Sequence, residues 1–332
     1  MKPKYYLIIL LLLLLPTLAL AYSGHSKTLS AKTEKTLGLD YYYGRNGEKQ
    51  NYSKAMYWIK KSAVQGNARA QVDLGYAYYL GEGVKQNYSR AVYWFRKAAE
   101  QKNANAQVLL GYAYNFGHGV AQNYSKAVYW FRKAAIQGDA SGQVDLGYAY
   151  YLGEGVKQNY FRAVYWYKKA AVSGNGFAQD HLGVAYNFGH GVAQNYSKAV
   201  YWFRKAAIQG DAGGQVDLGY AYYFGHGVVQ NYSMAAYWFK KAAAQGNLSG
   251  QFSLANSYYF GHGVKRNYSK AVYWFKKAAA QGNAGAQAIL GIAYYLGRGV
   301  KQNYSKAVYW LKKAAAQGSV EAETFLNKIK HR

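Results

Sequence analysis

The dipeptide Asn-Tyr, followed by Ser in all copies but one, returns along this chain every 36 residues. A fixed period of this length is typical of stacked helical hairpins, in which each unit buries its apolar face only against its neighbours. The sequence therefore predicts an all-α solenoid of about eight 36-residue helix-turn-helix repeats. The copies begin at Asn51, Asn87, Asn123, Asn159, Asn195, Asn231, Asn267 and Asn303.

Each repeat contains the signals for two helices. In the unit that begins at Asn67, this residue is expected to cap a first helix that runs to about Leu80, because a short polar side chain accepts from the free amides of the first turn. Gly81 then allows a left-handed termination. Asn87 is expected to cap the second helix, which ends near Lys102. Asp139, Asp211, Asn247 and Asn283 occupy the position of Asn67 in other copies.

The two helices of a repeat differ in the face that they leave exposed. In the first helix the apolar stripe includes Leu74 and Tyr78, which leaves Tyr76 and Tyr79 to face outward. In the second helix the stripe runs through Phe95, and the opposite face is basic. The eight tryptophans, one in each second helix, lie at the edge of the stripe and are expected to pack between repeats rather than to bind a ligand.

The N-terminus has the pattern of a secretory signal. Lys2 and Lys4 precede an apolar run, and Ala19-Leu20-Ala21 resembles a leader peptidase site. We expect a signal peptide over residues 1–21, rather than the alternative of an uncleaved membrane anchor, because the apolar run is shorter than the roughly 20 residues of a spanning helix. The remaining segments are then a flexible lead-in over 22–32, a degenerate capping half-repeat over 33–50, the repeat array over 51–318 and a capping helix over 319–332.

Charge and cysteine content narrow the classes of partner. The chain has no cysteine, so repeat stacking rather than disulfides must stabilise an exported protein of this kind. Its formal net charge is +27, or +25 once residues 1–21 with their two lysines are removed. Such a surface attracts acidic proteins, acidic glycans and anionic lipids, and export makes nucleic acid the least expected partner.

One set of residues within the repeat matches a known pattern. These residues are Ala70-Gln71, Leu74-Gly75, Tyr78, the loop Gly81-Glu82-Gly83-Val84, Asn87, Ala91, Phe95 and Lys97-Ala98-Ala99. They resemble a tetratricopeptide unit, and they are more similar to the Sel-1-like repeat family, over about residues 36 to 330. The resemblance implies a right-handed superhelix that holds other proteins or peptides, often in the bacterial envelope. A cysteine-rich branch of this family is linked to β-lactam binding, and this chain lacks the paired cysteines of that branch.

If the tetratricopeptide arrangement applies, the first helices line the concave side and the second helices the convex side. The expected partner-binding groove consists of Tyr76, Tyr79, Tyr112, Asn115, Tyr148, Tyr151, Asn187, Tyr220, Tyr223, Tyr259 and Tyr295. The expected anion-facing convex surface consists of Arg90, Arg96, Lys97, Lys126, Arg132, Lys133, Lys198, Arg204, Lys205, Lys270, Lys276 and Lys277, with tyrosines between them in position for cation–π contacts.

No set of residues in the sequence points to catalysis or to a bound metal or cofactor. His118, His190, His226 and His262 recur in Gly-His-Gly loops one repeat apart, too far apart to share a metal, and are expected to be solvated. Asp73, Asp145 and Asp217 recur in every second copy without a partner base. The eight Asn-x-Ser sequons, seven Asn-Tyr-Ser and Asn247-Leu248-Ser249, would accept glycans in a eukaryotic secretory pathway, but helix capping explains seven of the eight without sugar.

These observations leave three hypotheses. The first is a non-catalytic exported scaffold, expected to be monomeric, periplasmic or secreted and of bacterial origin, that binds a protein or peptide along the tyrosine groove. The second is a cell-wall protein related to glycan or β-lactam binding, and the third is charge-driven adhesion to anionic lipid or polysaccharide. In a eukaryotic source the same fold would suggest an adaptor in lumenal quality control.

Overall fold

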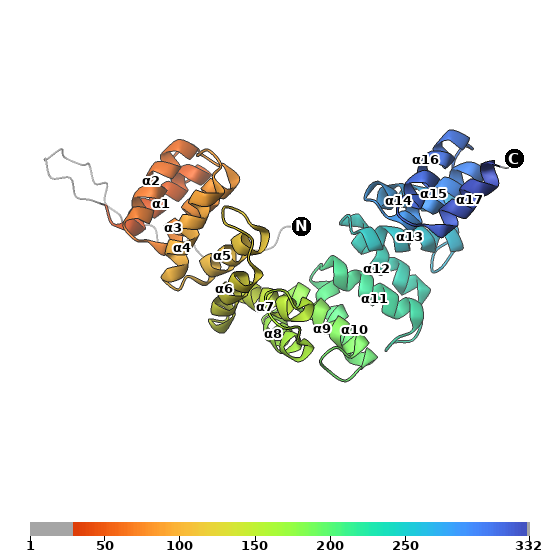
Figure 1. Cartoon of the computed structure of the whole chain (residues 1–332), viewed down its shortest axis with the longest axis horizontal. Coiled ribbons are helices and arrows are strands. Elements are labelled where there is room, and N and C mark those ends of the chain that lie inside the picture. The colour runs from red at the N-terminus through yellow and green to blue at the C-terminus, as the bar shows by residue number, and fades with distance from the viewer. Residues whose placement is uncertain (1–28, 331–332) are drawn as a thin grey trace.

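The computed structural model describes residues 29–330 of the 332-residue chain, so the expected signal peptide and most of the lead-in lie outside the described residues. The described part is all-α and forms seventeen helices, with α1 to α16 in eight sequence-adjacent pairs followed by α17, as the repeat predicts. The pairs follow one another along an open arc, with α1 and α17 at its two ends (Figure 1).

Odd and even helices correspond to the first and second helices of the repeat. The odd helices are α1 (Ala31–Tyr43), α3 (Ala68–Leu80), α5 (Ala104–Phe116), α7 (Ala140–Leu152), α9 (Gly176–Phe188), α11 (Ala212–Phe224), α13 (Leu248–Phe260), α15 (Ala284–Leu296) and α17 (Val320–Lys330). The even helices are α2 (Tyr52–Val64), α4 (Tyr88–Glu100), α6 (Tyr124–Ile136), α8 (Tyr160–Val172), α10 (Tyr196–Ile208), α12 (Tyr232–Ala244), α14 (Tyr268–Ala280) and α16 (Tyr304–Ala315).

The helix ends follow from the caps that the sequence contains. The side chain of Asn67 accepts from the third amide of α3, and Asn87 does the same for α4, as expected. Helix α1 begins at Ala31, two residues before the expected half-repeat, because Ser30 caps it. Gly81 ends α3 at φ +82°, and after α4 Lys102 takes the positive φ that glycine takes in the other copies.

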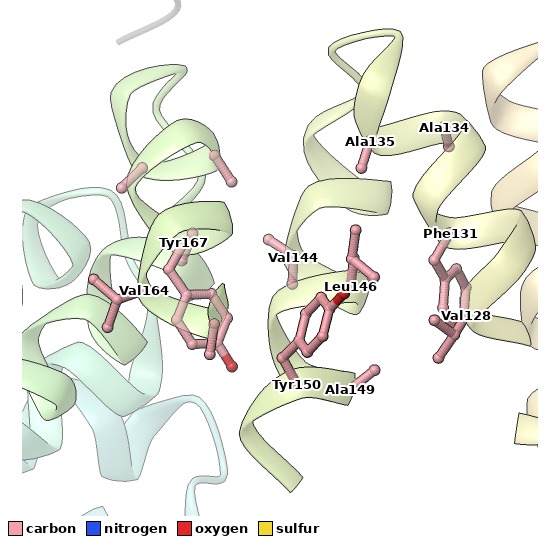
Figure 2. Close-up of a cluster of buried hydrophobic side chains, with 14 of the residues drawn as sticks. Val128, Phe131, Ala134, Ala135, Val144, Leu146, Ala149, Tyr150, Val164 and Tyr167 are labelled. Carbon is pink, nitrogen blue, oxygen red and sulfur yellow. The ribbon is translucent and has the colours of Figure 1, made fainter. Parts of the chain in front are cut away.

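Each hairpin closes around an aromatic or aliphatic side chain. A Cβ on Gly75 would lie 2.4 Å from a carbon of the Phe95 ring, so only glycine lets α3 and α4 approach this closely. Leu74 and its copies are almost fully buried beside this contact. Figure 2 shows the same arrangement in the middle of the array, where Phe131 of α6 and Tyr167 of α8 lie on the two sides of Leu146.

Successive hairpins are also joined through their loops. Gly119 of the loop after α5 lies against the start of α4, and a Cβ on Gly119 would lie 2.4 Å from the carbonyl oxygen of Tyr88. Because Gly119 also has φ +74°, this position favours glycine for two independent reasons. The second glycine of the Gly-x-Gly-Val loop therefore connects repeats, whereas the first ends a helix.

A buried glutamine in the odd helices forms a polar link between repeats. The side-chain amide of Gln71 donates to the carbonyl of Ala63 in α2 at 3.0 Å, and its oxygen accepts from Gln101, 30 residues later, at 2.8 Å. Five further hydrogen bonds of the same kind span 2.6 to 2.9 Å. They run from Gln137 to Gln107, Gln209 to Gln179, Gln245 to Gln215, Gln281 to Gln251 and Gln317 to Gln287. Gln143 has no such donor, because Ser173 stands where the other repeats have glutamine.

We predict that Ser173→Gln stabilises the array and that Gln209→Ser destabilises it. The first substitution supplies the donor that Gln143 lacks, and the second removes the donor of Gln179, so each should change the free energy of unfolding by about 1 kcal/mol, in opposite directions. Urea denaturation followed by circular dichroism measures both. If Ser173→Gln left stability unchanged while Gln209→Ser reduced it, the glutamine would matter through packing and not through the link.

Candidate functional site

The odd helices are closer to one another along the arc than the even helices are. Neighbouring odd helices contact each other at α5 with α7, α9 with α11, α11 with α13 and α15 with α17, whereas neighbouring even helices make fewer contacts. In a curved stack the elements on the inner side have the shorter path and so lie closer together. This spacing corresponds to an inner side formed by odd helices, and we call their exposed surface the inner face and that of the even helices the outer face.

The eleven residues expected to form the groove all lie on odd helices and all retain solvent exposure. Tyr76 and Tyr148 are the most open, with 38% and 41% of their surface exposed, and the remaining nine are half-buried. The rings of Tyr76 and Tyr112 pack edge-on against Phe95 and Phe131 of their own hairpins. The tyrosines are therefore held by the core on one side and open on the other.

Tyrosines at the position of Tyr79 bond to the loop of the next repeat. Tyr79 pairs with Nδ1 of His118 at 2.9 Å, and Tyr223 pairs with His262 at the same distance. Tyr151 reaches His190 at 3.3 Å, and Tyr259 accepts from Arg298 at 2.9 Å. The histidine rings also stack on the tyrosine that begins an even helix, as His118 does on Tyr88.

These contacts change the interpretation of the loop histidines. They were expected to be solvated, yet His118, His190 and His262 bond to tyrosines of the previous repeat, and His226, opposite Asn187, stacks on Tyr196 of the previous repeat instead. The hydroxyl groups of Tyr79, Tyr151 and Tyr223 are thus engaged within the protein. The rings, rather than these hydroxyls, are what the inner face offers to a partner.

A row of apolar side chains at the last position of the odd helices was not expected from the sequence. Each residue stands four positions after the Tyr76 position and so lies on the same helix face. All seven are between 41% and 61% exposed. An apolar residue recurring off the buried stripe was the available signal. The row consists of Leu80, Phe116, Leu152, Phe188, Phe224, Phe260 and Leu296.

Charge is segregated between the two faces. Helices α5, α7, α9, α11, α13 and α15 contain no lysine or arginine, and Asp145, Asp180 and Asp217 are the only acidic residues within them. Each even helix carries two or three basic residues, and Glu100 is the only acidic residue in this set. The inner face is therefore aromatic and weakly acidic on a strongly basic protein.

The three inner aspartates are substantially buried. Burial raises the pKa of Asp145 to about 7, and the hydroxyl of Tyr112, which faces this carboxylate, offsets part of the rise. The Oδ2 atom of Asp145 is buried without a hydrogen-bond partner. A carboxyl in this environment changes charge near neutral pH.

Asp180 of α9 and Asp217 of α11 form a carboxyl pair between two repeats. Burial, together with the charges of the other carboxyl and of Asp211, raises the pKa of Asp180 well above its usual range. The Oδ1 atom of Asp180 is buried without a hydrogen-bond partner, so ionising this carboxyl beside a second one is unfavourable. His181, whose ring stacks on Phe177 at 3.9 Å, lies beside the pair, and burial lowers its pKa. The sequence suggested no partner for Asp217, and the fold supplies one.

Two cavities of the inner face are equivalent by an offset of 72 residues. The larger, about 700 Å³, lies between α5 and α7 and is lined by residues that include Tyr112, Asp145 and Glu154. The smaller, about 330 Å³, lies between α9 and α11, where Val184, Asp217 and His226 take the same three positions. The 72-residue super-period of the sequence therefore produces two related but chemically different cavities.

The twelve residues expected on the convex side are all exposed, and all make contacts within the protein. Lys133 lies over the rings of Tyr129 and Trp130 at 4.7 and 5.2 Å, and Arg96 donates to the hydroxyl of Tyr114 in the next repeat at 3.0 Å. The cation–π contacts expected from the sequence are therefore present. They hold the cations against aromatic rings while leaving their charge at the surface.

Neither a metal site nor a spanning helix is found in the part of the chain that the structure describes. Residues 29–330 contain no group of three histidine or acidic residues placed to hold a metal ion. Among the same residues, no helix combines the length and apolar character needed to cross a bilayer.

The repeats match the model of a known repeat family. The Sel1 repeat model matches eight consecutive segments, over residues 37–67, 68–103, 104–139, 140–175, 176–211, 212–247, 248–283 and 284–319. No curated protein matches the chain.

The similar solved structures include two bacterial proteins that cover most of this chain. The structure of c5321, a protective antigen present in uropathogenic Escherichia coli strains, has a TM-score of 0.75 and 40% identity over 91% of this chain, which spans 65% of the length of that protein. A Sel1 repeat protein from Oxalobacter formigenes has a TM-score of 0.69 and 32% identity, covering 90% of this chain and 86% of its own.

We predict that Asp180→Val stabilises the protein at pH 8. Four other repeats have valine at this position, at Val72, Val108, Val144 and Val216. Burial raises the pKa of Asp180 and Asp217 in the folded state, so the folded protein holds their protons more tightly than the unfolded chain does. The stability that these protonated carboxyls contribute is complete below about pH 4 and is lost as the pH rises through the folded pKa values. Removing one carboxyl should raise the free energy of unfolding at pH 8 by about 1–3 kcal/mol.

Urea midpoints at pH 5 and pH 8 measure this effect. The parent should lose more stability than the valine variant between the two values. Glu100→Gln, which removes an exposed carboxylate of α4, serves as the control and should keep the parental response. A valine variant that is less stable than the parent at pH 8 would show that the pair stabilises the fold.

Proposed function

The chain belongs to the Sel1 repeat family, and we propose that it is a non-catalytic scaffold that binds a partner protein or peptide along the inner face of its odd helices. The observation that carries this proposal is the apolar row from Leu80 to Leu296, which runs beside the half-exposed tyrosines. Monomeric proteins rarely expose contiguous apolar surface of this kind without a use for it.

The type of partner follows from the shape of this surface. The same aromatic and apolar positions recur on neighbouring helices along the arc, which suits an extended polypeptide better than a small molecule. The rings of Tyr76, Tyr112 and Tyr220 are held by edge contacts to Phe95, Phe131 and Phe239, so little side-chain entropy is lost on binding. Rigid amphipathic rings of this type are frequent in binding hot spots.

We further propose that the protein acts outside the cytoplasm of a bacterium. The sequence pattern of residues 1–21 supports export, and the two similar structures come from bacteria. The Escherichia coli relative is a protective antigen, which agrees with an exported role for this chain.

We predict that photo-crosslinkers at Leu152 and Phe224 capture a partner and that crosslinkers at Ile136 and Ile208 do not. The first pair lies on the inner face, and the second pair comprises exposed apolar residues at the ends of the outer helices α6 and α10, each 71% exposed. Replacing Leu152 and Phe224 together by serine should weaken capture from an envelope extract about tenfold or more, because each is an exposed apolar anchor.

The matched control is the double variant Ile136→Ser and Ile208→Ser, which should capture as the parent does. Circular dichroism establishes that both double variants are folded. Equal crosslinking from the two faces, or capture that survives the inner substitutions, would contradict binding along the inner face.

A second candidate function is supported by the segregation of charge. The outer face carries exposed cations on every even helix with a single acidic residue among them, which suits adhesion to anionic lipid or polysaccharide. This activity would use the face opposite to the proposed groove, so the two functions do not compete.

We predict that binding to vesicles containing anionic lipid falls steeply as salt rises, because the Debye length shortens from about 10 Å at 0.1 M to about 3 Å at 1 M. Replacing Lys97, Lys133, Lys205 and Lys277 by glutamine should weaken it further at low salt. Co-sedimentation at a series of salt concentrations measures both effects. Binding that ignores salt, or that depends on Leu152 and Phe224 instead, would argue against the outer face.

A further inference from the structure

The cavity between α5 and α7 combines carboxylates with aromatic walls. Asp145 and Glu154 are the only charged residues that line it, and the lining also includes Tyr112, Phe116 and Tyr148. Accepting the proposed function, we propose that this cavity binds the cationic side chain of a lysine or arginine in the partner peptide. The inner face would then select a basic residue at one position of the peptide.

The charge of the cavity is opposite to that of the protein around it. No lysine, arginine or histidine lines the cavity, although the chain carries 41 basic and 14 acidic residues. An anionic ligand would be attracted to the outer face and would meet two carboxylates here. A cationic group entering the cavity instead finds partners that no cation of the protein already occupies.

The walls of the cavity suit a guanidinium or ammonium group. Tyr112 packs against Phe116 with their rings nearly parallel at 6.2 Å, and Tyr148 contacts Phe177 edge-on at the same separation. Phe116, Tyr148 and Phe177 are each about 40–60% exposed, so part of each ring remains available. The outer face shows this preference within the protein, because its lysines already lie over tyrosine and tryptophan rings.

The burial of Asp145 also favours a bound cation. Its Oδ2 atom has no hydrogen-bond partner, and burial raises its pKa to about 7. The titratable groups that face it are Tyr112 of α5, Asp139 at the start of α7 and Tyr167 of α8, and none of them carries positive charge. A bound cation would stabilise the ionised carboxylate, so binding should strengthen from pH 6 to pH 8.

The smaller cavity, between α9 and α11, has the equivalent position in the fold but a different set of lining residues. There His226 replaces Glu154, Val184 replaces Tyr112, and Asp217 is the only acidic residue of the lining. The smaller cavity therefore has one carboxylate and one aromatic wall fewer. We assign the cation to the cavity between α5 and α7 for this reason.

Calorimetric titration of the full chain with two pentapeptides tests the assignment. One is acetyl-Gly-Gly-Arg-Gly-Gly-amide, and the other has citrulline, which is neutral and of similar shape, in place of arginine. The arginine peptide should bind about tenfold or more tightly than the citrulline peptide. Asp145→Asn and Glu154→Gln should each reduce this preference, and the double variant should abolish it.

Glu100→Gln on α4 removes an acidic charge that does not line the cavity and serves as the matched control, with binding unchanged. Because asparagine and glutamine keep the shape of the acids, the variants should stay folded, which thermal melts establish. Equal binding of the two peptides, absence of binding up to about 10 mM, or a preference that survives the double substitution would overturn the assignment.

The outcome is separable from that of the proposed function. If inner-face crosslinkers capture a partner but the arginine peptide does not bind, the cation site is wrong and the scaffold stands. If the peptide binds through Asp145 and Glu154 but no partner crosslinks, the site is real and the scaffold function is wrong.

Discussion

The buried glutamine of the odd helices is the polar contact that fixes the register of stacking at six junctions between repeats, and the junction at Gln143 stacks without it. Adjacent hairpins have nearly identical apolar faces, so burial alone drives stacking without selecting one register. A primary amide in the interior needs partners for both its nitrogen and its oxygen, and Gln71 finds them on Ala63 and Gln101. A slipped register would leave such a group unpaired at a cost of about 1–3 kcal/mol in each repeat. Apolar burial therefore supplies the energy of stacking, and the glutamines supply its register.

Fixed register in turn determines the curvature and rigidity of the inner face. The same small rotation at each repeat produces an arc, and the arc brings neighbouring odd helices into contact. The loop glycine Gly119 against Tyr88 and the pair of Tyr79 with His118 tie each hairpin to the previous one on this side. Because the inner rings are held in this way, a partner would meet a surface that is already ordered, which lowers the entropic cost of binding.

The sequence predicts the local features of this structure well and the contacts between repeats poorly. Period, caps and apolar stripes are encoded within a few residues of one another, so Asn67, Gly81 and Phe95 could be assigned directly. The pairing of Tyr79 with a histidine 39 residues later depends on how one hairpin sits on the next, which no local pattern records. Asp180 and Asp217 could not be paired for the same reason. The exposed row that begins at Leu80 was hidden because apolar residues in helices are usually assigned to the core.

Differences between the repeats indicate where the chain carries its specificity. The even helices hardly vary, and α6 and α10 have identical sequences, so the outer face repeats one chemistry along the array. The inner-face positions of the odd helices change from repeat to repeat, with Asp145 and Tyr148 in α7 replaced by His181 and Val184 in α9. A face that served stacking alone would have no reason to differ between copies that stack in the same way. We therefore propose that discrimination between partners rests on the odd helices, where the repeats contribute different aromatic, apolar and acidic groups.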